Sequence, residues 1–435
     1  MAIKYGDTSG TLYGYGGSQT LYGTEFADLL IGDARTIAAR SQGGNDTLYG
    51  AGGDDVLNGD AIYLYGSGGN DLLYGEEGAD TLNGDGQEMR GSARGGADVL
   101  DGGSGNDLLR GDAYEMFDAA QGAADTLRGG SGNDTVYGDA HYMHQSSTGA
   151  NDQLNGGTGD DKLFGDANAM FSDSKGGNDR LYGEGGDDDL YGDALQLRDN
   201  ATGGDDTLYG DGRVFPNRET DNDELYGDAG TMLGGAHGGT DKLYGGDGDD
   251  KLYGDAGSMY DTSEGAADYL YGGSGNDWLY GEANAMYGSA KAADDFLYGQ
   301  DGDDKIWGDA SDMPSTIAGG NDVLNGGAGW DELYGNSGND TLIGGAGTDG
   351  LWGGTGSDVF VFSSGDGVNF IHDFNQNECD KIDLRAFGYD SFDDVQIREN
   401  GYNGNAQVML GGSFDWVDVI GLAPYQLSAA DFLFA

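Results

Sequence analysis

The sequence predicts an all-β fold, a parallel β-solenoid of about thirteen coils that ends in a small β-rich cap. Three observations lead to this prediction. A glycine-rich phrase followed by Asp recurs along most of the chain, as in residues 102–109 (GGSGNDLL) and 129–136 (GGSGNDTV). Its aspartates recur at a near-constant spacing, and an apolar residue follows two positions after each. Such a repeat is typical of stacked coils that bury their apolar faces against one another.

The aspartates form two alternating series, in which most neighbours are 27 residues apart. One series comprises Asp28, Asp55, Asp80, Asp107, Asp134, Asp161, Asp188, Asp223, Asp250, Asp277, Asp304 and Asp331. The other comprises Asp46, Asp71, Asp98, Asp125, Asp152, Asp179, Asp206, Asp241, Asp268, Asp295 and Asp322. Steps of 9 and 18 residues alternate between the series, so each 27-residue coil should have one tight turn and one extended loop.

Two segments depart from this period. Residues 210–223 lengthen one tight turn by eight residues. After Asp331, the aspartates Asp340, Asp349 and Asp358 follow at intervals of 9, without the extended loop. We therefore expect residues 1–358 to form the solenoid and residues 359–435 the cap.

The residues around each aspartate predict short strands and tight turns. Leu100 and Leu109 each lie two positions after an aspartate, and strand alternation turns such residues inward and their neighbours outward. Glycines at the first and fourth turn positions, such as Gly245 and Gly248, allow positive φ and a close approach of two backbones. The coils should hydrogen-bond to one another about 4.8 Å apart.

The charge of the chain requires a cationic partner. Its 78 Asp and Glu against 20 Lys and Arg give a formal net charge of -58, which leaves no basic surface for nucleic acid or anionic lipid. Stacked aspartates about 4.8 Å apart would repel by up to about 3.5 kcal/mol per pair at an effective dielectric constant of 20. A hard divalent cation with six to eight oxygen ligands suits carboxylates and turn carbonyls, so metal binding and folding should be one event.

Residues 40–358 resemble the repeats-in-toxin (RTX) family, whose β-rolls hold calcium between successive turns. The resemblance implies that Ca²⁺ is the cofactor and that each turn aspartate shares an ion with the aspartate one coil on. The implied ligands are Asp55, Asp80, Asp107, Asp134, Asp161, Asp188, Asp250, Asp277, Asp304, Asp331, Asp340, Asp349 and Asp358, with the turn glycines Gly102, Gly129, Gly156, Gly245, Gly272 and Gly326.

The second edge departs from the family pattern, because the extended loop intervenes there. Candidate ligands on that edge are Asp46, Asp71, Asp98, Asp125, Asp152, Asp179, Asp206, Asp241, Asp268, Asp295 and Asp322. A further set lies in the phrase Gly-Asp-Ala-x-x-Met or its variants: Asp60, Asp112, Asp139, Asp166, Asp193, Asp228, Asp255 and Asp309. These latter aspartates have two interpretations, which do not exclude one another: each caps a single helical turn, or each supplies a carboxylate to calcium.

The methionine of that phrase recurs in register. Eight of the ten Met residues occupy this position: Met89, Met116, Met143, Met170, Met232, Met259, Met286 and Met313, while Ile37, Leu64 and Leu197 fill it in other coils. An apolar residue repeated in every coil predicts a buried ladder, a second strip of core or a third wall of the solenoid; the alternative is a binding surface.

Aromatic residues also recur, one position after the inward Leu. They are Tyr49, Tyr74, Tyr137, Tyr182, Tyr191, Tyr209, Tyr226, Tyr244, Tyr253, Tyr271, Tyr280, Tyr298 and Tyr334, with Trp307 in register. We expect them to point outward in rows. Such rows either stabilise neighbouring strands by stacking or form a flat surface for sugars or self-association.

The tail after Asp358 loses the glycine period and ends in DFLFA. It resembles the C-terminal segment of serralysins and other proteins secreted by type I exporters, which implies a cap on the last coil and an uncleaved export signal. Residues 1–10 lack the pattern of a secretory leader, in keeping with leaderless export to the cell surface or the medium. The first coil has no comparable cap, so its open edge is a candidate for self-association.

The sequence predicts a non-enzyme. It contains no HExxH zinc motif and no G-x-S-x-G nucleophile motif. It also has no apolar stretch long enough to span a membrane. The leading hypothesis is a secreted calcium-dependent structural protein of a surface layer, matrix or filament. The alternatives are an adhesin or glycan-binding module that uses the Tyr rows, and the export module of a larger enzyme.

Overall fold

The computed structural model describes the 435-residue chain except for residues 1, 6–10, 15–16, 212–220 and 412–414. The insertion predicted within residues 210–223 and the N-terminal residues 6–10 therefore fall largely outside the described residues. The chain forms two compact units, Met1–Asp241 with Asp261–Ser263, and Lys242–Tyr260 with Glu264–Ala435. Both are built almost entirely of strands, which confirms the predicted all-β solenoid. Among the described residues, no helix is long and apolar enough to cross a membrane.

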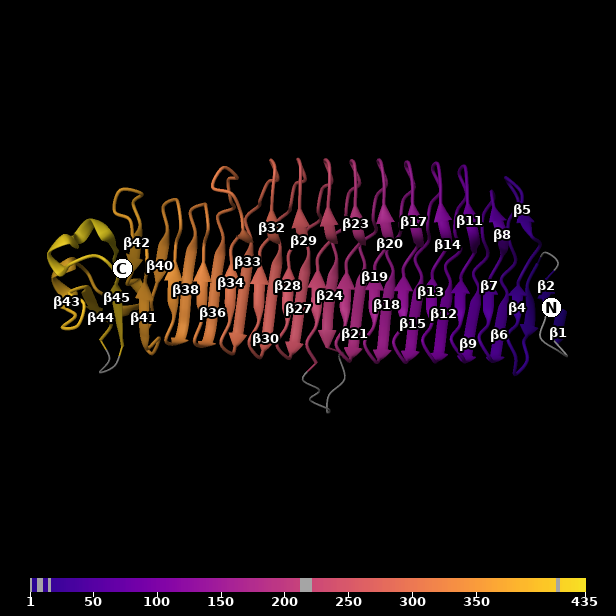
Figure 1. Ribbon diagram of the computed structural model, residues 1–435, viewed down its shortest axis with the longest axis horizontal. Coiled ribbons are helices and arrows are strands. Elements are labelled where there is room, and N and C mark those ends of the chain that lie inside the picture. The colour runs from indigo at the N-terminus through magenta and orange to yellow at the C-terminus, as the bar shows by residue number, and fades with distance from the viewer. Residues whose placement is uncertain (1, 6–10, 15–16, 212–220, 412–414) are drawn as a thin grey trace. The chain divides into compact units, whose positions relative to one another are not determined.

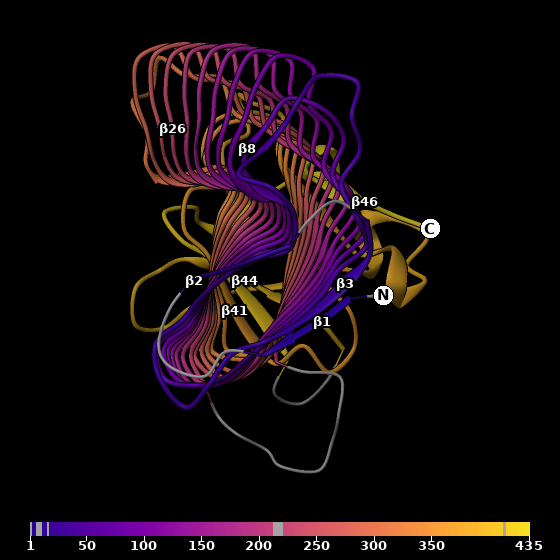
Figure 2. The ribbon, with the colours of Figure 1, turned by 90° about the vertical axis from the view of Figure 1, so that its right-hand side faces the viewer.

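Each complete coil contributes one strand to each of three walls, which we call A, B and C. In one coil these are β12 (Val99–Ser104), β13 (Leu108–Arg110) and β14 (Ala113–Met116). Each strand pairs in parallel and in register with its equivalent one coil on, so that Leu100 faces Leu127 and Leu109 faces Val136. In the view along the stack, walls A and B form one lobe and wall C a second lobe joined to it (Figure 2).

The strands of the first unit lie side by side in each wall (Figure 1). Wall A comprises β1 (Ala2–Tyr5), β3 (Gln19–Tyr22), β6 (Thr47–Gly52), β9 (Leu72–Glu77), β12, β15 (Thr126–Ser131), β18 (Gln153–Thr158), β21 (Arg180–Gly185) and β24 (Thr207–Asp211). Wall B comprises β2 (Thr11–Tyr13), β4 (Leu29–Ile31), β7 (Val56–Asn58), β10 (Thr81–Asn83), β13, β16 (Thr135–Tyr137), β19 (Lys162–Phe164), β22 (Asp189–Tyr191) and β25 (Glu224–Tyr226). Wall C comprises β5 (Thr36–Ile37), β8 (Ala61–Leu64), β11 (Gly86–Met89), β14, β17 (Ala140–Met143), β20 (Ala167–Met170), β23 (Ala194–Leu197) and β26 (Ala229–Met232).

The second unit repeats this plan and then simplifies it. Wall A comprises β27 (Lys242–Asp247), β30 (Tyr269–Ser274), β33 (Phe296–Asp301), β36 (Val323–Gly329), β38 (Thr341–Gly347), β40 (Val359–Val361), β42 (Lys381–Asp383) and β46 (Phe432–Leu433). Wall B comprises β28 (Lys251–Tyr253), β31 (Trp278–Tyr280), β34 (Lys305–Trp307), β37 (Glu332–Tyr334), β39 (Gly350–Trp352) and β41 (Val368–Ile371). Wall C has only β29 (Ala256–Met259), β32 (Ala283–Met286) and β35 (Ala310–Asp312), because the later repeats lack the extended loop.

The C-terminal part of the second unit adds antiparallel strands to wall B. They are β43 (Gln396–Glu399), β44 (Ala406–Met409) and β45 (Trp416–Val419), and β45 also pairs in parallel with β41. Four short 3-10 helices accompany them: η1 (Arg385–Phe387), η2 (Phe392–Asp394), η3 (Pro424–Gln426) and η4 (Ala429–Asp431). The division into residues 1–358 and 359–435 stays a prediction.

The predicted number of about thirteen coils is slightly too high. Wall C has eleven strands, so the described chain has eleven complete three-walled coils, eight in the first unit and three in the second. The other coils have two walls, because their repeats are too short to form a third strand. Counting aspartates did not distinguish these two kinds of coil.

Two apolar ladders form the core. Leu100, Leu109 and their equivalents are fully buried between walls A and B, as predicted from strand alternation. The Met ladder is buried too, since Met89, Met116 and Met143 have no exposed surface. Met313 is only half-buried. The extended loop therefore forms a third wall with its own core.

The expected outward rows of aromatic residues are only partly correct. On wall A, rings such as Tyr49 and Tyr74 are half-buried and stack with centroids 5.1 Å apart. On wall B, Tyr137, Phe164 and Tyr191 are buried and stack with centroids 4.8 Å apart. Wall C continues from the end of wall B and covers this second row, which alternation within one strand could not reveal.

Candidate metal sites at the coil corners

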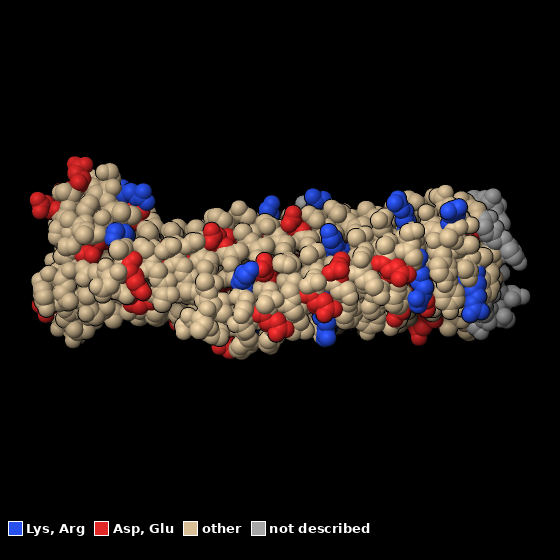
Figure 3. Space-filling view, turned by 90° about the horizontal axis from the view of Figure 1, so that it is seen from above, with Lys and Arg blue, Asp and Glu red and all other residues tan. Residues whose placement is uncertain are grey.

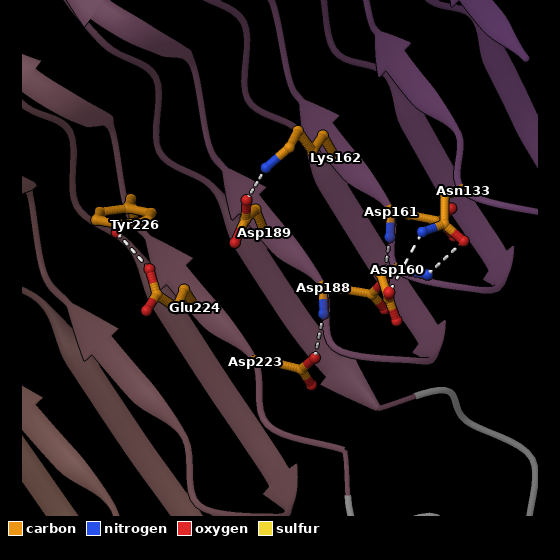
Figure 4. A network of polar contacts seen from close by, with 9 residues as sticks. All are labelled: Asn133, Asp160, Asp161, Lys162, Asp188, Asp189, Asp223, Glu224 and Tyr226. Carbon is orange, nitrogen blue, oxygen red and sulfur yellow. Dashed lines mark hydrogen bonds and ion pairs between the residues drawn. The ribbon is translucent and has the colours of Figure 1, made fainter. Parts of the chain in front are cut away.

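A ladder of aspartates runs along the tight turns between walls A and B. The backbone N–H of Asp107 donates to Oδ1 of Asp134 at 2.7 Å, and the N–H of Asp134 donates to Oδ1 of Asp161 at 2.7 Å. Figure 4 shows the next two steps, from Asp161 to Asp188 and from Asp188 to Asp223. Each carboxylate is thus fixed by one oxygen to the backbone of the preceding coil.

The other oxygen of these carboxylates has no hydrogen-bond partner. Oδ2 of Asp107, Asp134 and Asp161 is buried and accepts no hydrogen bond. A Cβ placed on Gly129 would lie 2.3 Å from Oδ2 of Asp134 and 2.6 Å from the carbonyl oxygen of Gly156. The glycine therefore keeps open a small space lined by a carboxylate oxygen and a carbonyl oxygen, the ligand types that hard cations prefer.

The structure brings most of the predicted turn ligands into this ladder. In the first unit the ladder joins Asp28, Asp55, Asp80, Asp107, Asp134, Asp161, Asp188 and Asp223. In the second it joins Asp250, Asp277, Asp304, Asp331 and Asp349. A Cβ on any of the predicted first-position glycines would lie 2.3–2.5 Å from Oδ2 of the aspartate five residues on; these glycines are Gly102, Gly129, Gly156, Gly245, Gly272 and Gly326.

A second ladder of the same kind runs along the corner where the chain returns to wall A. In the first unit it joins Asp46, Asp71, Asp98, Asp125, Asp152, Asp179, Asp206 and Asp241. In the second it joins Asp268, Asp295, Asp322, Asp340, Asp358 and Asp380. Asp340 and Asp358, predicted as turn ligands, thus lie in line with the return-corner aspartates.

The aspartates of the Gly-Asp-Ala phrase lie at the entrance to wall C. The helical turn considered for them is absent, because Ala-x-x-Met forms the wall C strand. Instead, Oδ1 of Asp166 accepts from the N–H of Gly177 at 2.9 Å, and Oδ1 of Asp193 accepts from the N–H of Gly204 at 2.9 Å. Each carboxylate therefore bridges the start and the end of its own extended loop.

The turn glycines have two distinct roles. Glycines at the first position, such as Gly102, do not have positive φ and are required by close approach. Those at the fourth position, such as Gly105 with φ of 136°, need the conformational freedom of glycine. The second position also has positive φ, even where it is Glu76 or Gln300, which the sequence did not indicate.

Within the described residues, no three His, Cys, Asp or Glu side chains form a group suited to one ion. An ion at a tight turn would therefore combine one or two carboxylates with backbone carbonyl oxygens. This is the ligand set of calcium and not that of zinc, which takes nitrogen and sulfur ligands.

The family model of the RTX calcium-binding nonapeptide repeat matches more than half of the chain. The matched segments are residues 13–34, 40–61, 63–88, 92–113, 120–141, 146–169, 174–194, 236–258, 263–285, 289–312, 318–342, 325–360 and 334–368. The chain belongs to the RTX calcium-binding repeat family. No curated protein matches it. The RTX repeats imply that the protein binds calcium.

Burial sets the electrostatics of the RTX turns. It raises the pKa of Asp107, Asp134 and Asp161 to about 7, against the opposing effect of the backbone N–H that each accepts. Burial also raises the pKa of Asp112 and Asp125 well above the usual range. Repulsion from Asp125 raises the pKa of Asp112 further, and repulsion from Asp98 and Asp152 does the same for Asp125. Acidic side chains are accordingly scattered on the face drawn in Figure 3, although the chain is strongly acidic. A cation that replaces these protons would relieve the cost of burying the charge.

Both ladders end on residues that the repeat pattern did not identify. The N–H of Asp349 donates to Oδ1 of Asn369 at 3.2 Å, and the N–H of Asp358 donates to Oδ1 of Asp380 at 3.1 Å. The spacings of 20 and 22 residues differ from the preceding 18, so a search for the period alone misses these positions. An Asn ends one ladder with a neutral acceptor in place of another carboxylate.

Proposed function

We propose that this protein is a secreted structural repeat protein whose solenoid folds when calcium fills the tight turns after export. The observation that carries the proposal is the row of buried Oδ2 atoms without hydrogen-bond partners, each facing a space that a first-position glycine keeps open. Buried polar atoms normally have partners, and leaving charged ones unpaired is costly. Calcium between successive turns supplies that partner.

Folding that depends on calcium follows from the stacking itself. Rings on wall B repeat at 4.8 Å, so equivalent carboxylates in adjacent coils lie at about the same separation. Forming the coils brings these charges together, whereas the unfolded chain keeps them apart. Binding a divalent ion therefore favours the coiled state, and its binding free energy becomes folding free energy.

The proposed export route fits this dependence. The tail resembles those of type I secreted proteins, and a chain that is unfolded at low cytosolic calcium can pass through a narrow exporter. It would then fold in the medium or at the cell surface. The partners in this proposal are calcium and the export machinery, with no nucleic acid and no catalytic role.

We further propose that the folded protein assembles into a layer, matrix or filament. Candidate contacts are the exposed rings Phe26 and Trp330, which have 64% and 69% of their surface exposed. The alternative is glycan binding by the wall A row, where Tyr244 and Tyr271 stack with centroids 4.9 Å apart and remain half-exposed. The buried part of the wall B row, which includes Tyr137, Phe164 and Tyr191, is no longer a candidate for such a surface.

Circular dichroism combined with sedimentation during a calcium titration tests both parts. We expect β-structure to appear cooperatively with calcium and larger species to follow at higher protein concentration. At pH 8 and without osmolyte, a β-rich spectrum that survives exhaustive chelation would contradict calcium-dependent folding. Folding without growth in size, together with binding on a glycan array that Tyr244→Ala and Tyr271→Ala abolish, would favour the alternative.

A further inference from the structure

Two rows of acidic side chains face each other where wall C joins walls A and B, a region that we call the neck. Each three-walled coil contributes one acid from the start of the extended loop and one from its end. The pairs are Asp33 and Asp46, Asp60 and Asp71, Asp85 and Asp98, Asp112 and Asp125, Asp139 and Asp152, Asp166 and Asp179, Asp193 and Asp206, Asp228 and Asp241, Asp255 and Asp268, Glu282 and Asp295, and Asp309 and Asp322. At the neck the extended loop replaces the tight turn, so the tight-turn sites do not account for these acids.

The neck acids are among the most deeply buried groups of the protein. Asp112 and Asp139 have no exposed surface, and Asp125 and Asp152 have 3% and 4%. Both carboxylate oxygens of Asp112, Oδ1 of Asp139 and Oδ2 of Asp125 and Asp152 are buried without a hydrogen-bond partner. The charges that raise the pKa of Asp112 are those of Asp125 and Asp85, which are carboxylates too. Carboxylates at this depth are ionised only with a counterion, and without one they hold a proton.

Oxygen atoms line two small spaces in each coil. A Cβ on Gly122 would lie 2.4 Å from Oδ2 of Asp112 and 1.7 Å from Oδ1 of Asp139, so carboxylates of successive coils face each other across this point. A Cβ on Gly111 would lie 2.2 Å from Oδ2 of Asp125 and 1.9 Å from the carbonyl oxygen of Gly138. The same arrangement recurs one coil on. Carboxylate and carbonyl oxygens at such spacing form a ligand set for a hard divalent cation.

The pattern of residue types favours carboxyl groups over neutral amides at these positions. All eleven pairs consist of two acids, although Asn could accept the same backbone hydrogen bonds. In the exposed position before the turn aspartate, by contrast, both Asn and Asp occur. Asn133 accepts the backbone N–H of Asp160, and Asp160 accepts that of Asp187, so hydrogen bonding alone tolerates either type. One coil has Glu282 in place of Asp and Ala292 in place of the loop glycine. The acid is longer and the space beside it is smaller in this coil, but the residue is still an acid.

We infer that the neck binds a second row of divalent cations, calcium in the native protein, with one ion for each three-walled coil that has a glycine at the position of Gly122. Two carboxylates per coil carry two negative charges, which one divalent ion neutralises. In the best-defined coil the proposed ligands are two carboxylates, Asp112 and Asp139, which face each other at the Gly122 point, while Asp125 and the carbonyl oxygen of Gly138 line the neighbouring point at Gly111. This row is separate from the tight-turn row, although the inference rests on the proposed calcium-dependent folding. The competing arrangement is a chain of carboxyl groups that share protons.

The test compares two matched triple variants of the full chain. The neck variant is Asp112→Asn, Asp139→Asn and Asp166→Asn, and the turn variant is Asp107→Asn, Asp134→Asn and Asp161→Asn. Both remove three carboxylates in the same three coils and keep an oxygen that can accept the backbone N–H. The measurement is calcium bound per chain, by elemental analysis after dialysis against saturating calcium chloride, with folding checked by circular dichroism.

We expect each triple variant to bind about three to four fewer calcium ions than the wild type, since each carboxylate borders the ions on both sides. Full calcium content in the neck variant, with a loss only in the turn variant, would overturn the inference and favour shared protons. Calcium-free folding of the wild type would instead contradict the proposed function. If the neck variant does not fold, Gly149→Ala replaces it in the test. Its methyl group would occupy the space between Asp139 and Asp166 and leave both carboxylates in place. We expect Gly149→Ala to bind one calcium ion fewer than the wild type. Ala292→Gly is the control and should lose no ion.

Discussion

Replacing Asp134 by Asn should change the stability of the solenoid in opposite directions with and without calcium. Asp134 lies between Asp107 and Asp161 in the tight-turn ladder. Stacked rings give the coil repeat as 4.8 Å. At that separation two ionised carboxylates repel by about 3.5 kcal/mol at an effective dielectric constant of 20, so two neighbours contribute about 7 kcal/mol. Without calcium, at a pH above the raised pKa values, the variant should be more stable by up to that amount.

With calcium the sign reverses. The carboxylate then borders an ion on each side, and removing one partner from a buried charge cluster costs about 3–5 kcal/mol. The amide oxygen of the variant can still accept the N–H of Asp107, so the loss of the hydrogen bond does not explain the effect. The difference between the changes in unfolding free energy with and without calcium therefore measures the effect of the carboxylate charge alone.

Urea unfolding followed by circular dichroism at pH 8 measures both values, in saturating calcium and in chelator. A fixed concentration of stabilising osmolyte populates the folded form in the chelated samples. Asp160→Asn is the matched control, because it removes the same charge from an exposed position of the neighbouring coil and should stay within about 0.5 kcal/mol in both conditions. Destabilisation of Asp134→Asn in both conditions would refute the argument from stacked charge.

Three further predictions rest on the same geometry. Gly129→Ala should lower the calcium content by about one ion and raise the calcium concentration at the midpoint of folding, because its Cβ would lie 2.3 Å from Oδ2 of Asp134. Gly235→Ala is the control and should change neither quantity, because the nearest neighbour of its Cβ is a side-chain oxygen at 3.3 Å. In chelator, the solenoid should become more stable as the pH falls. The pKa values of the turn aspartates are raised from 3.8 to about 7 in the folded state, so protonation of these groups stabilises the fold fully below pH 3.8, and this stabilisation is lost as the pH rises through 7. In saturating calcium the solenoid should instead become less stable as the pH falls, because protons compete with calcium for the carboxylates. A calcium midpoint of folding that does not change between pH 5 and 8 would contradict this competition. Met143→Ala should cost about 2–5 kcal/mol in thermal or urea unfolding without changing the number of bound ions, and the half-buried Met313→Ala should cost less.

Much of the candidate site was predictable because register in a solenoid is a linear property of the sequence. Residues one period apart must meet, so the pairing of Leu100 with Leu127 and the stacking of Asp107 on Asp134 follow from spacing alone. The spacing does not specify which carboxylate oxygen binds the backbone and which remains available to a ligand. The division of each carboxylate into an Oδ1 bound to the backbone and an Oδ2 left for a ligand depends on the path of the turn backbone.

The extended loop shows the same limit more clearly. The sequence identified a buried Met ladder, but a helical turn and a strand both fitted Gly-Asp-Ala-x-x-Met. The strand prevails because Ala113 and Met116 pair with Ala140 and Met143 one coil on. That wall then buries Tyr137 and Tyr191, which were expected to face outward.

The sequence by itself determined the all-β class, the period, the inward apolar ladders and the rows of stacked carboxylates, because a parallel coil turns a repeat in sequence into a repeat in space. Only the tertiary structure decided that the loop forms a third wall, that one aromatic row is covered, and that Asp112 and Asp125 meet in a buried neck. These outcomes depend on packing between segments of the same coil, and the period of the repeat carries no information about that packing.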